Sequence, residues 1–152
     1  MNAVSVHQAV LADLDDLASL FDRYRQFQGK ASDLAAARAF LSERFNHQES
    51  VLFIARLEQK AVGFAQLFPS FSSVALQRVF ILNDLFVEES GRGVGAASQL
   101  LAALEQYAWS FGAVRVSLNV AIENTSAQNL YASRGWKKDD QFFMFHRFPP
   151  EP

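Results

Sequence analysis

The chain has 152 residues, half of them hydrophobic, and a formal net charge of −2. This composition is too apolar for a disordered chain and lacks the basic excess that favours nucleic-acid binding. The absence of cysteine excludes disulfides, thiolate metal sites and cysteine nucleophiles. Without a signal-peptide pattern or an apolar run of membrane-spanning length, we expect a soluble cytoplasmic protein that has neither a membrane nor nucleic acid as partner.

The first third of the chain predicts one strand and two helices. Valines alternate with other residues over 3–10, which is typical of a strand. Apolar residues recur at helical spacing over 12–28, and Gly29 is a fitting helix stop. A second helix is expected over 33–46, with Asp33 as its N-cap.

The middle of the chain predicts strands. Two apolar runs, 51–57 and 61–68, are separated by a short polar turn and indicate an antiparallel hairpin. Pro69 is expected to end the second of these strands. Residues 76–87 predict another strand, of unusual length.

The last third predicts alternating helices and strands. A glycine-rich stretch leads into a helix over 94–111, which Gly112 ends. A buried strand is expected over 114–120, a short helix over 125–134 and a final strand over 141–148. Because consecutive residues of that final strand are apolar, both of its faces should be covered, one of them by a second subunit.

The order of these elements predicts the fold class. One strand and two helices precede three strands, and a helix, a strand, a helix and a strand follow. This order predicts an α/β (α+β) protein with a mixed sheet and helices on both faces. No repeat and no linker interrupts the pattern, so we expect a single domain over residues 1–152.

The stretch "EESGRGVGAA" connects a predicted strand to a predicted helix. Unpaired amides and a partial positive charge at a helix N-terminus favour an anion. Glycines allow the backbone to approach that anion and to adopt positive φ, and Arg92 adds a charge suited to phosphate. The stretch therefore indicates either a pyrophosphate site or a plain connection into an amphipathic helix.

Two other phosphate motifs fit this stretch less well. Gly91, Gly93 and Ala96 satisfy the dinucleotide pattern G-x-G-x-x-A, but the next strand does not end in the required acidic residue. The P-loop pattern fails because no Lys-Ser/Thr pair follows the glycines.

Two spaced motifs resemble those of the GNAT superfamily of acetyl-CoA-dependent N-acetyltransferases. "RGVGAA" matches the signature Q/R-x-x-G-x-G/A, with Arg92, Gly95 and Ala97 at the defined positions. "ENTSAQNLYASRGW" is similar to the family segment N-x-x-A-x-x-x-Y-x-x-x-G-F, with Trp in place of the common Phe. The resemblance is close over residues 79–136, and it implies the GNAT fold, whose mostly antiparallel mixed sheet splays between the fourth and fifth strands.

The resemblance also implies how acetyl-CoA binds. Its pantetheine arm should pair like an added strand with the backbone of Leu85, Phe86 and Val87. Asn124 resembles the family asparagine that hydrogen-bonds the pantetheine, although it can equally cap the following helix. The resemblance implies a pyrophosphate site on the amides of Arg92, Gly93, Val94, Gly95, Ala96 and Ala97.

The same resemblance suggests the catalytic residues. Tyr131 should donate a proton to the departing thiolate, the alternative being a core tyrosine. The attacking amine must lose a proton, and Asp84 is the first candidate for the base, the alternative being a structural carboxylate. In polyamine-acetylating relatives an acidic pair occupies positions 83 and 84, whereas here the first of the pair is Asn83. Glu123 and His7 are weaker candidates for the base.

The expected function is N-acetylation. The resemblance implies transfer from acetyl-CoA to a small-molecule primary amine or a peptide amino group, by direct attack in a ternary complex because no cysteine can carry the acetyl group. A non-catalytic acyl-CoA-binding regulatory module is the alternative. The three histidines lack metal-ligand spacing, so no metal is expected. Family members are often dimers, so a homodimer is expected.

Overall fold

The computed structural model describes residues 3–152. It divides the chain into two compact units, residues 1–119 and 120–152. The first unit contains a five-stranded sheet and three helices, and the second contains one helix and an extended C-terminal segment. The single domain expected from the sequence stays a prediction.

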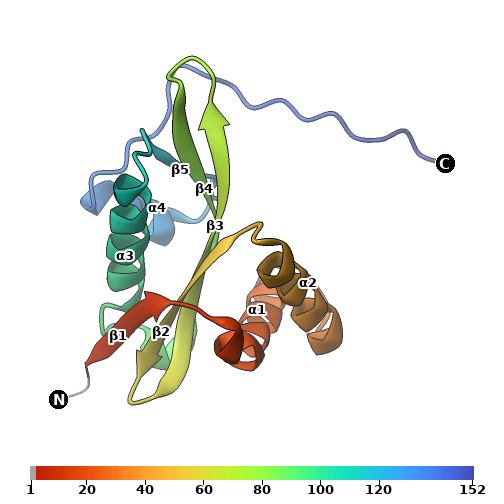
Figure 1. The fold of residues 1–152 in the computed structure, drawn as a ribbon, viewed down its shortest axis with the longest axis vertical. Helices are drawn as coiled ribbons and strands as arrows, with labels where there is room; N and C mark the ends of the chain where they lie inside the picture. Colours follow the sequence, from red (N-terminus) through yellow and green to blue (C-terminus); the bar gives the residue numbers. More distant parts are fainter. Residues whose placement is uncertain (1–2) are drawn as a thin grey trace. The chain divides into compact units, whose positions relative to one another are not determined.

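The sheet of the first unit follows the chain, with the strands in sequence order (Figure 1). Neighbouring strands are antiparallel from β1 to β4, whereas β4 and β5 are parallel. This arrangement confirms the predicted mixed, mostly antiparallel sheet. The strands are β1 (Val4–Gln8), β2 (Val51–Leu57), β3 (Lys60–Ser72), β4 (Gln77–Val87) and β5 (Val116–Leu118).

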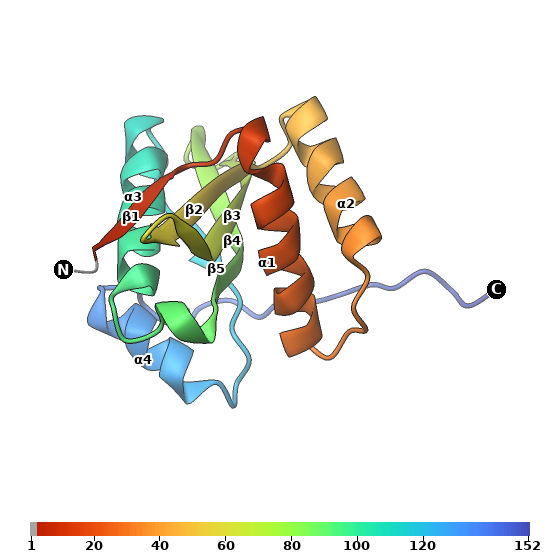
Figure 2. The same cartoon turned by 90° about the horizontal axis from the view of Figure 1, so that it is seen from below.

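Helices cover both faces of this sheet, as predicted. The helices α1 (Leu14–Phe27) and α2 (Leu34–His47) lie on one face, and α3 (Ala96–Ser110) lies on the other (Figure 2). A 3-10 turn, Leu11–Asp13, leads into α1. The carboxylate of Asp33 accepts the Ala36 amide at 3.1 Å, which confirms this residue as the N-cap of α2.

The apolar run of β2 is explained by burial on both faces. Leu52 and Ile54 belong to the core that α1 and α2 form with the sheet. Phe53 points the other way, and its ring centroid lies 5.7 Å from that of Tyr107 on α3. A strand buried on both sides has no polar face, so its sequence shows no alternation.

The expected end of a strand at Pro69 is wrong. β3 continues to Ser72, and Pro69 pairs with Phe80 of β4. The pairing of β3 with β2 already ends at Leu67, opposite Val51. Beyond that point β3 has one free edge, where the missing N–H of proline breaks no ladder.

The fifth strand is shorter and more exposed than predicted. β5 spans three residues instead of the seven residues 114–120, and none of the three is buried. Its ladder with β4 begins at Phe80 and Val116 and ends at Leu82 and Leu118. Because β4 runs on to Val87, its last residues extend beyond the pairing with β5, as expected for a sheet that opens between the fourth and fifth strands.

The second unit contains α4 (Thr125–Ser133), close to the predicted helix. The expected strand over 141–148 is wrong, because these residues pair with no strand and contain no regular secondary structure. Within the chain, Phe143 is 92% and Phe145 89% exposed, so this segment is not covered by the protein's own elements. Over residues 3–152, no helix combines the length and apolarity that crossing a membrane requires.

Candidate functional site

The end of β4 is shaped by a bulge. Gln66 of β3 pairs with Asp84 and Leu67 pairs with Leu82, so Asn83 is an extra residue on β4. The last pair with β5 also falls at Leu82. A bulge bends a strand and increases its twist, so the extra residue accounts for the point at which β4 leaves β5.

The bulge also changes which face of the sheet the even-numbered residues of β4 occupy. Before it, Phe80 contacts Tyr107 of α3, with ring centroids 5.7 Å apart. After it, Phe86 contacts Tyr24 and Phe27 of α1, at 5.9 and 6.3 Å. Strict alternation would keep residues 80 and 86 on one face. The extra residue therefore directs the last part of β4 toward α1.

The glycine loop, residues 88–95, joins β4 to α3. Gly93 and Gly95 have φ of 79° and 84°, which side chains with a Cβ rarely adopt. A Cβ at either glycine would meet nothing within 4 Å, so the loop needs these glycines for conformation and the space before it is open. The first α3 amide to donate to a carbonyl is that of Gln99, which reaches Gly95 O at 3.0 Å.

This geometry makes the start of α3 an anion-binding end. The amides of Ala96 and Ala97 precede the first helical hydrogen bond and have no intrahelical acceptor. The helix dipole adds a partial positive charge at the same place. Arg92 steadies the loop, because its Nε donates to Val87 O of β4 at 3.1 Å.

Asp84 lies buried on the α1 side of the sheet, with 6% of its surface exposed. Its Oδ2 accepts from Gln66 Nε2 at 2.7 Å and its Oδ1 from Asn83 Nδ2 at 3.2 Å. Tyr24 also hydrogen-bonds this carboxyl group. The orientation of Gln66 is fixed in turn, because its Oε1 accepts from Ser50 at 2.8 Å.

Burial dominates the acidity of Asp84. Removal from water raises the pKa of its carboxyl group above the usual value, although hydrogen bonds from Gln66, Asn83 and Tyr24 act in the opposite direction. A carboxylate whose pKa lies closer to neutrality is a better general base. These three partners are side chains of β3, β4 and α1.

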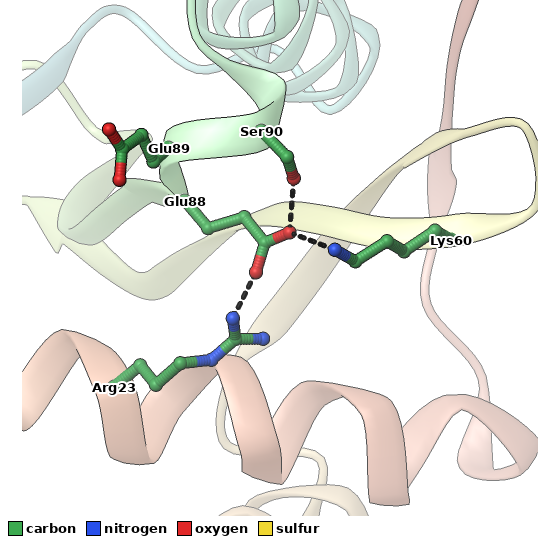
Figure 3. A pocket seen from close by; sticks show the side chains of 5 residues that line it. All are labelled: Arg23, Lys60, Glu88, Glu89 and Ser90. Atoms are coloured by element: carbon green, nitrogen blue, oxygen red, sulfur yellow. Dashed lines mark hydrogen bonds and ion pairs between the residues drawn. The ribbon is translucent and has the colours of Figure 1, made fainter.

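A cluster of charged and polar side chains around Glu88, at the start of the glycine loop, gave no distinct signal in the sequence. Glu88 is buried and contacts Arg23 of α1, Lys60 of β3 and Ser90 of the loop (Figure 3). Burial acts to raise the pKa of Glu88, but Ser90, Lys60 and Arg23 together lower it below the usual value. The cluster lines an open depression of about 420 Å³.

The second unit carries the two remaining predicted residues. Asn124 Oδ1 accepts the Ala127 amide at 3.2 Å, so the residue caps α4. Tyr131 lies seven residues further along the same helix, half-buried, with its ring 5.7 Å from that of Trp136. Burial raises the pKa of the Tyr131 phenol, so the hydroxyl keeps its proton at neutral pH.

Comparisons with known proteins identify the family. The model of the acetyltransferase (GNAT) family matches residues 14–136. The chain belongs to the GNAT acetyltransferase family. It is 42% identical over 142 residues to a protein of Bacillus subtilis (strain 168) named "Uncharacterized N-acetyltransferase YhfO", covering 93% of this chain and 95% of that protein.

Solved structures agree with this GNAT assignment. The crystal structure of a probable acetyltransferase superposes with a TM-score of 0.91 at 38% identity, covering 97% of this chain and 99% of the other. The aminoglycoside N-acetyltransferase AAC(6')-Iy, solved in complex with CoA, has a TM-score of 0.78 at 23% identity, covering 97% and 96%. The second similarity shows the fold alone.

The GNAT structure brings together one part of the predicted site. The first unit unites Asp84, the end of β4 over 85–87 and the loop amides over 92–97. Asn124 and Tyr131 share α4 in the second unit. His7 lies on β1, at the sheet edge opposite β5, and contacts Asp13 at 3.3 Å. Within residues 3–152 no group of three His, Cys, Asp or Glu side chains is arranged to hold a metal.

Proposed function

We propose that this GNAT protein transfers an acetyl group from acetyl-CoA to a primary amine by direct attack in a ternary complex. The observation that carries the proposal is the free end of β4 running into the glycine loop. An unpaired strand edge and an anion-binding helix end lie in succession along one short stretch of chain, residues 83–97. The two features suit the two chemical parts of CoA, an amide-containing arm and a pyrophosphate.

The donor is held by backbone groups. Leu85, Phe86 and Val87 lie beyond the last β4–β5 pair, so their edge can accept the pantetheine amides like an added strand. The amides over 93–97 bind the pyrophosphate, supported by the positive φ of the loop glycines and the dipole of α3. The predicted sixth amide, that of Arg92, is engaged instead, because it donates to Glu89 O at 3.1 Å. The CoA complex of the aminoglycoside N-acetyltransferase with this fold supports acetyl-CoA as the donor.

Two side chains move protons in the proposed reaction. Acetyl-CoA supplies an activated thioester. Asp84 takes the proton of the attacking nitrogen, and its raised pKa supports that role. Tyr131 gives its proton to the departing sulfur as the C–S bond breaks and the new C–N bond forms, and Asn124 orients the pantetheine arm. After both transfers the amide nitrogen and the CoA thiol are uncharged, and the proton on Asp84 returns to Tyr131 through water before the next turnover.

The acceptor is a primary amine on a small molecule or a peptide. Tyr24, Phe27 and Phe86 form an aromatic wall beside Asp84. Aromatic faces next to a carboxylate suit an alkyl ammonium group. The ammonium group loses its first proton to water, so that Asp84 is free to take the second proton when the neutral amine attacks. Asn83 in place of a second carboxylate weakens the case for a polyamine.

The proposed assembly is a homodimer. Five large apolar side chains between residues 142 and 148 are more than two-thirds exposed: Phe142, Phe143, Met144, Phe145 and Phe148. Such a run is unfavourable in water and is typical of an interface. We propose that a second copy of the chain covers it.

An amine panel with acetyl-CoA tests the proposed function. Because the chain has no cysteine, a thiol-reactive dye detects released CoA without background from the protein. We expect dye signal with at least one class among diamines, amino acids, aminoglycosides and peptide N-termini, with the acetylated product seen by mass spectrometry. Tight CoA binding without turnover of any amine would support the acyl-CoA-binding module instead. Failure to bind CoA at all would contradict both functions.

A further inference from the structure

Glu88 lies where β4 ends and the glycine loop begins, and its carboxylate is held from three sides. Only 7% of its side chain is exposed. Arg23 contacts one carboxylate oxygen, and Ser90 and Lys60 contact the other, with Lys60 Nζ at 3.1 Å. Figure 3 shows these three side chains converging on Glu88, whereas the neighbouring Glu89 points away.

The backbone of Glu88 is fixed as well. Its amide donates to Val62 O at 2.8 Å, and its carbonyl accepts the Gly91 amide at 2.9 Å. Side chain and main chain together tie the first residue of the loop to α1, to β3 and to the turn that follows. The direction in which the chain leaves β4 is therefore set at this residue.

A carboxylate beside a pyrophosphate site needs an explanation. Its negative charge repels phosphate, and it engages two cations that would otherwise attract phosphate. Electrostatic attraction of the donor therefore cannot be what Glu88 contributes. Its contacts instead favour a geometric role, in which it aims the amides that follow.

We propose that Glu88 is a positioning residue that presents the glycine-loop amides to the pyrophosphate of the donor. The inference rests on the proposed use of acetyl-CoA. It predicts a defect confined to donors that carry a pyrophosphate. S-acetylpantetheine has the same thioester and arm but no pyrophosphate, so it is the matched donor.

The test compares Glu88→Gln with Glu89→Gln, which removes the same charge one residue further along. Within residues 3–152 the Glu89 carboxylate makes no hydrogen bond or ion pair, so it is the control. We expect Glu88→Gln to lower kcat/KM for acetyl-CoA roughly tenfold to a hundredfold through KM. We expect kcat/KM for S-acetylpantetheine to change less than about twofold. CoA affinity measured by calorimetry on the folded variants should fall in parallel.

Three results would overturn the proposal. Equal losses with both donors would mean that Glu88 only maintains the fold. Unchanged kinetics with acetyl-CoA would mean that the loop is set elsewhere. Tighter CoA binding by Glu88→Gln would mean that Glu88 merely neutralises Arg23 and Lys60. A wild-type protein that fails to bind CoA would instead contradict the proposed function itself.

A second variant keeps the test valid if Glu88→Gln does not fold. Arg23 is 44% exposed at its side chain, and its replacement leaves Glu88 with Lys60 and Ser90 as partners. We expect Arg23→Gln to show the same donor-selective loss, smaller in size. Where both single variants fold, the fold-loss of kcat/KM for acetyl-CoA in the double variant should be smaller than the product of the two single fold-losses, because both substitutions act through one contact.

Discussion

At the scale of single residues, the hydroxyl group of Tyr131 is the proposed general acid that protonates the departing sulfur. Tyr131→Phe removes the phenolic proton and keeps the ring beside Trp136. We expect kcat to fall about 10²- to 10⁴-fold, as for other general acids, while CoA affinity stays within about twofold because the amides still bind the donor. Stopped-flow kinetics and calorimetry measure the two quantities.

The matched control for Tyr131 is another half-buried tyrosine. Tyr107→Phe alters a ring that packs between Phe53 and Phe80 on the α3 face. Its turnover should equal that of the wild type. If Tyr131→Phe also kept full turnover, the acid would have to be sought elsewhere.

Asp84 predicts a pH dependence. The base acts only when deprotonated, and burial raises its pKa. The value of kcat/KM for the amine should therefore fall as the pH drops through this raised pKa, at a higher pH than for an exposed aspartate. Asp84→Asn should lower the rate about 10²- to 10⁴-fold and remove this acidic limb from the pH–rate profile.

A surface aspartate provides the comparison for Asp84. Asp15 on α1 is 83% exposed at its side chain and pairs with Arg38. Asp15→Asn should leave the pH–rate profile unchanged. An acidic limb that persisted in Asp84→Asn would assign the base to another group.

At the scale of elements, a glycine lies at each end of α3, and replacing each one distinguishes an effect on stability from an effect on CoA binding. Gly95 precedes the helix with φ of 84°, and Gly112 follows it with φ of 74°. Alanine at either position should cost about 1–2 kcal/mol of stability, because both conformations are left-handed. Only Gly95→Ala should weaken CoA binding, roughly tenfold or more, because only it displaces the loop amides. Thermal unfolding measures the loss of stability, and calorimetry measures the affinity for CoA. Equal CoA affinity in the two variants would contradict the pyrophosphate site.

Local signals explain what could be predicted at this scale. Asp33, Gly29 and Gly112 act within one turn of their own position, so cap chemistry predicts the helix ends. The strand error at 141–148 arose because a ladder depends on a partner that the segment itself does not contain. The bulge at Asn83 is equally non-local, since it depends on the register between two strands.

The candidate site was predictable to the extent that its chemistry is continuous in sequence. The loop over 92–97 and the preceding strand end were found because they form one motif. Gln66 was missed, although an amide inside an apolar run is a detectable signal. Nothing local distinguishes Glu88 from Glu89, because burial and partners come from α1 and β3.

At the scale of the whole molecule, the C-terminal segment predicts self-association. Replacing Phe143 and Phe145 by Asp should convert the proposed dimer into a monomer, as measured by light scattering during size exclusion, because two charges cannot be buried there unpaired. The control is Val74→Asp, since Val74 is 99% exposed in the β3–β4 turn. A wild-type protein that is monomeric at high concentration would contradict the dimer.

The extra residue in β4 reverses the face of the sheet that each later residue of the strand occupies. A strand assigns alternate residues to opposite faces, so one inserted residue reassigns every residue after it. Upstream of Asn83 the even positions belong to the α3 face, and downstream they belong to the α1 face. Deleting Asn83 would leave the composition of the site almost intact and yet turn Asp84 and Phe86 toward the wrong helix. A single-residue indel here is thus a larger change to the proposed chemistry than most substitutions within the site.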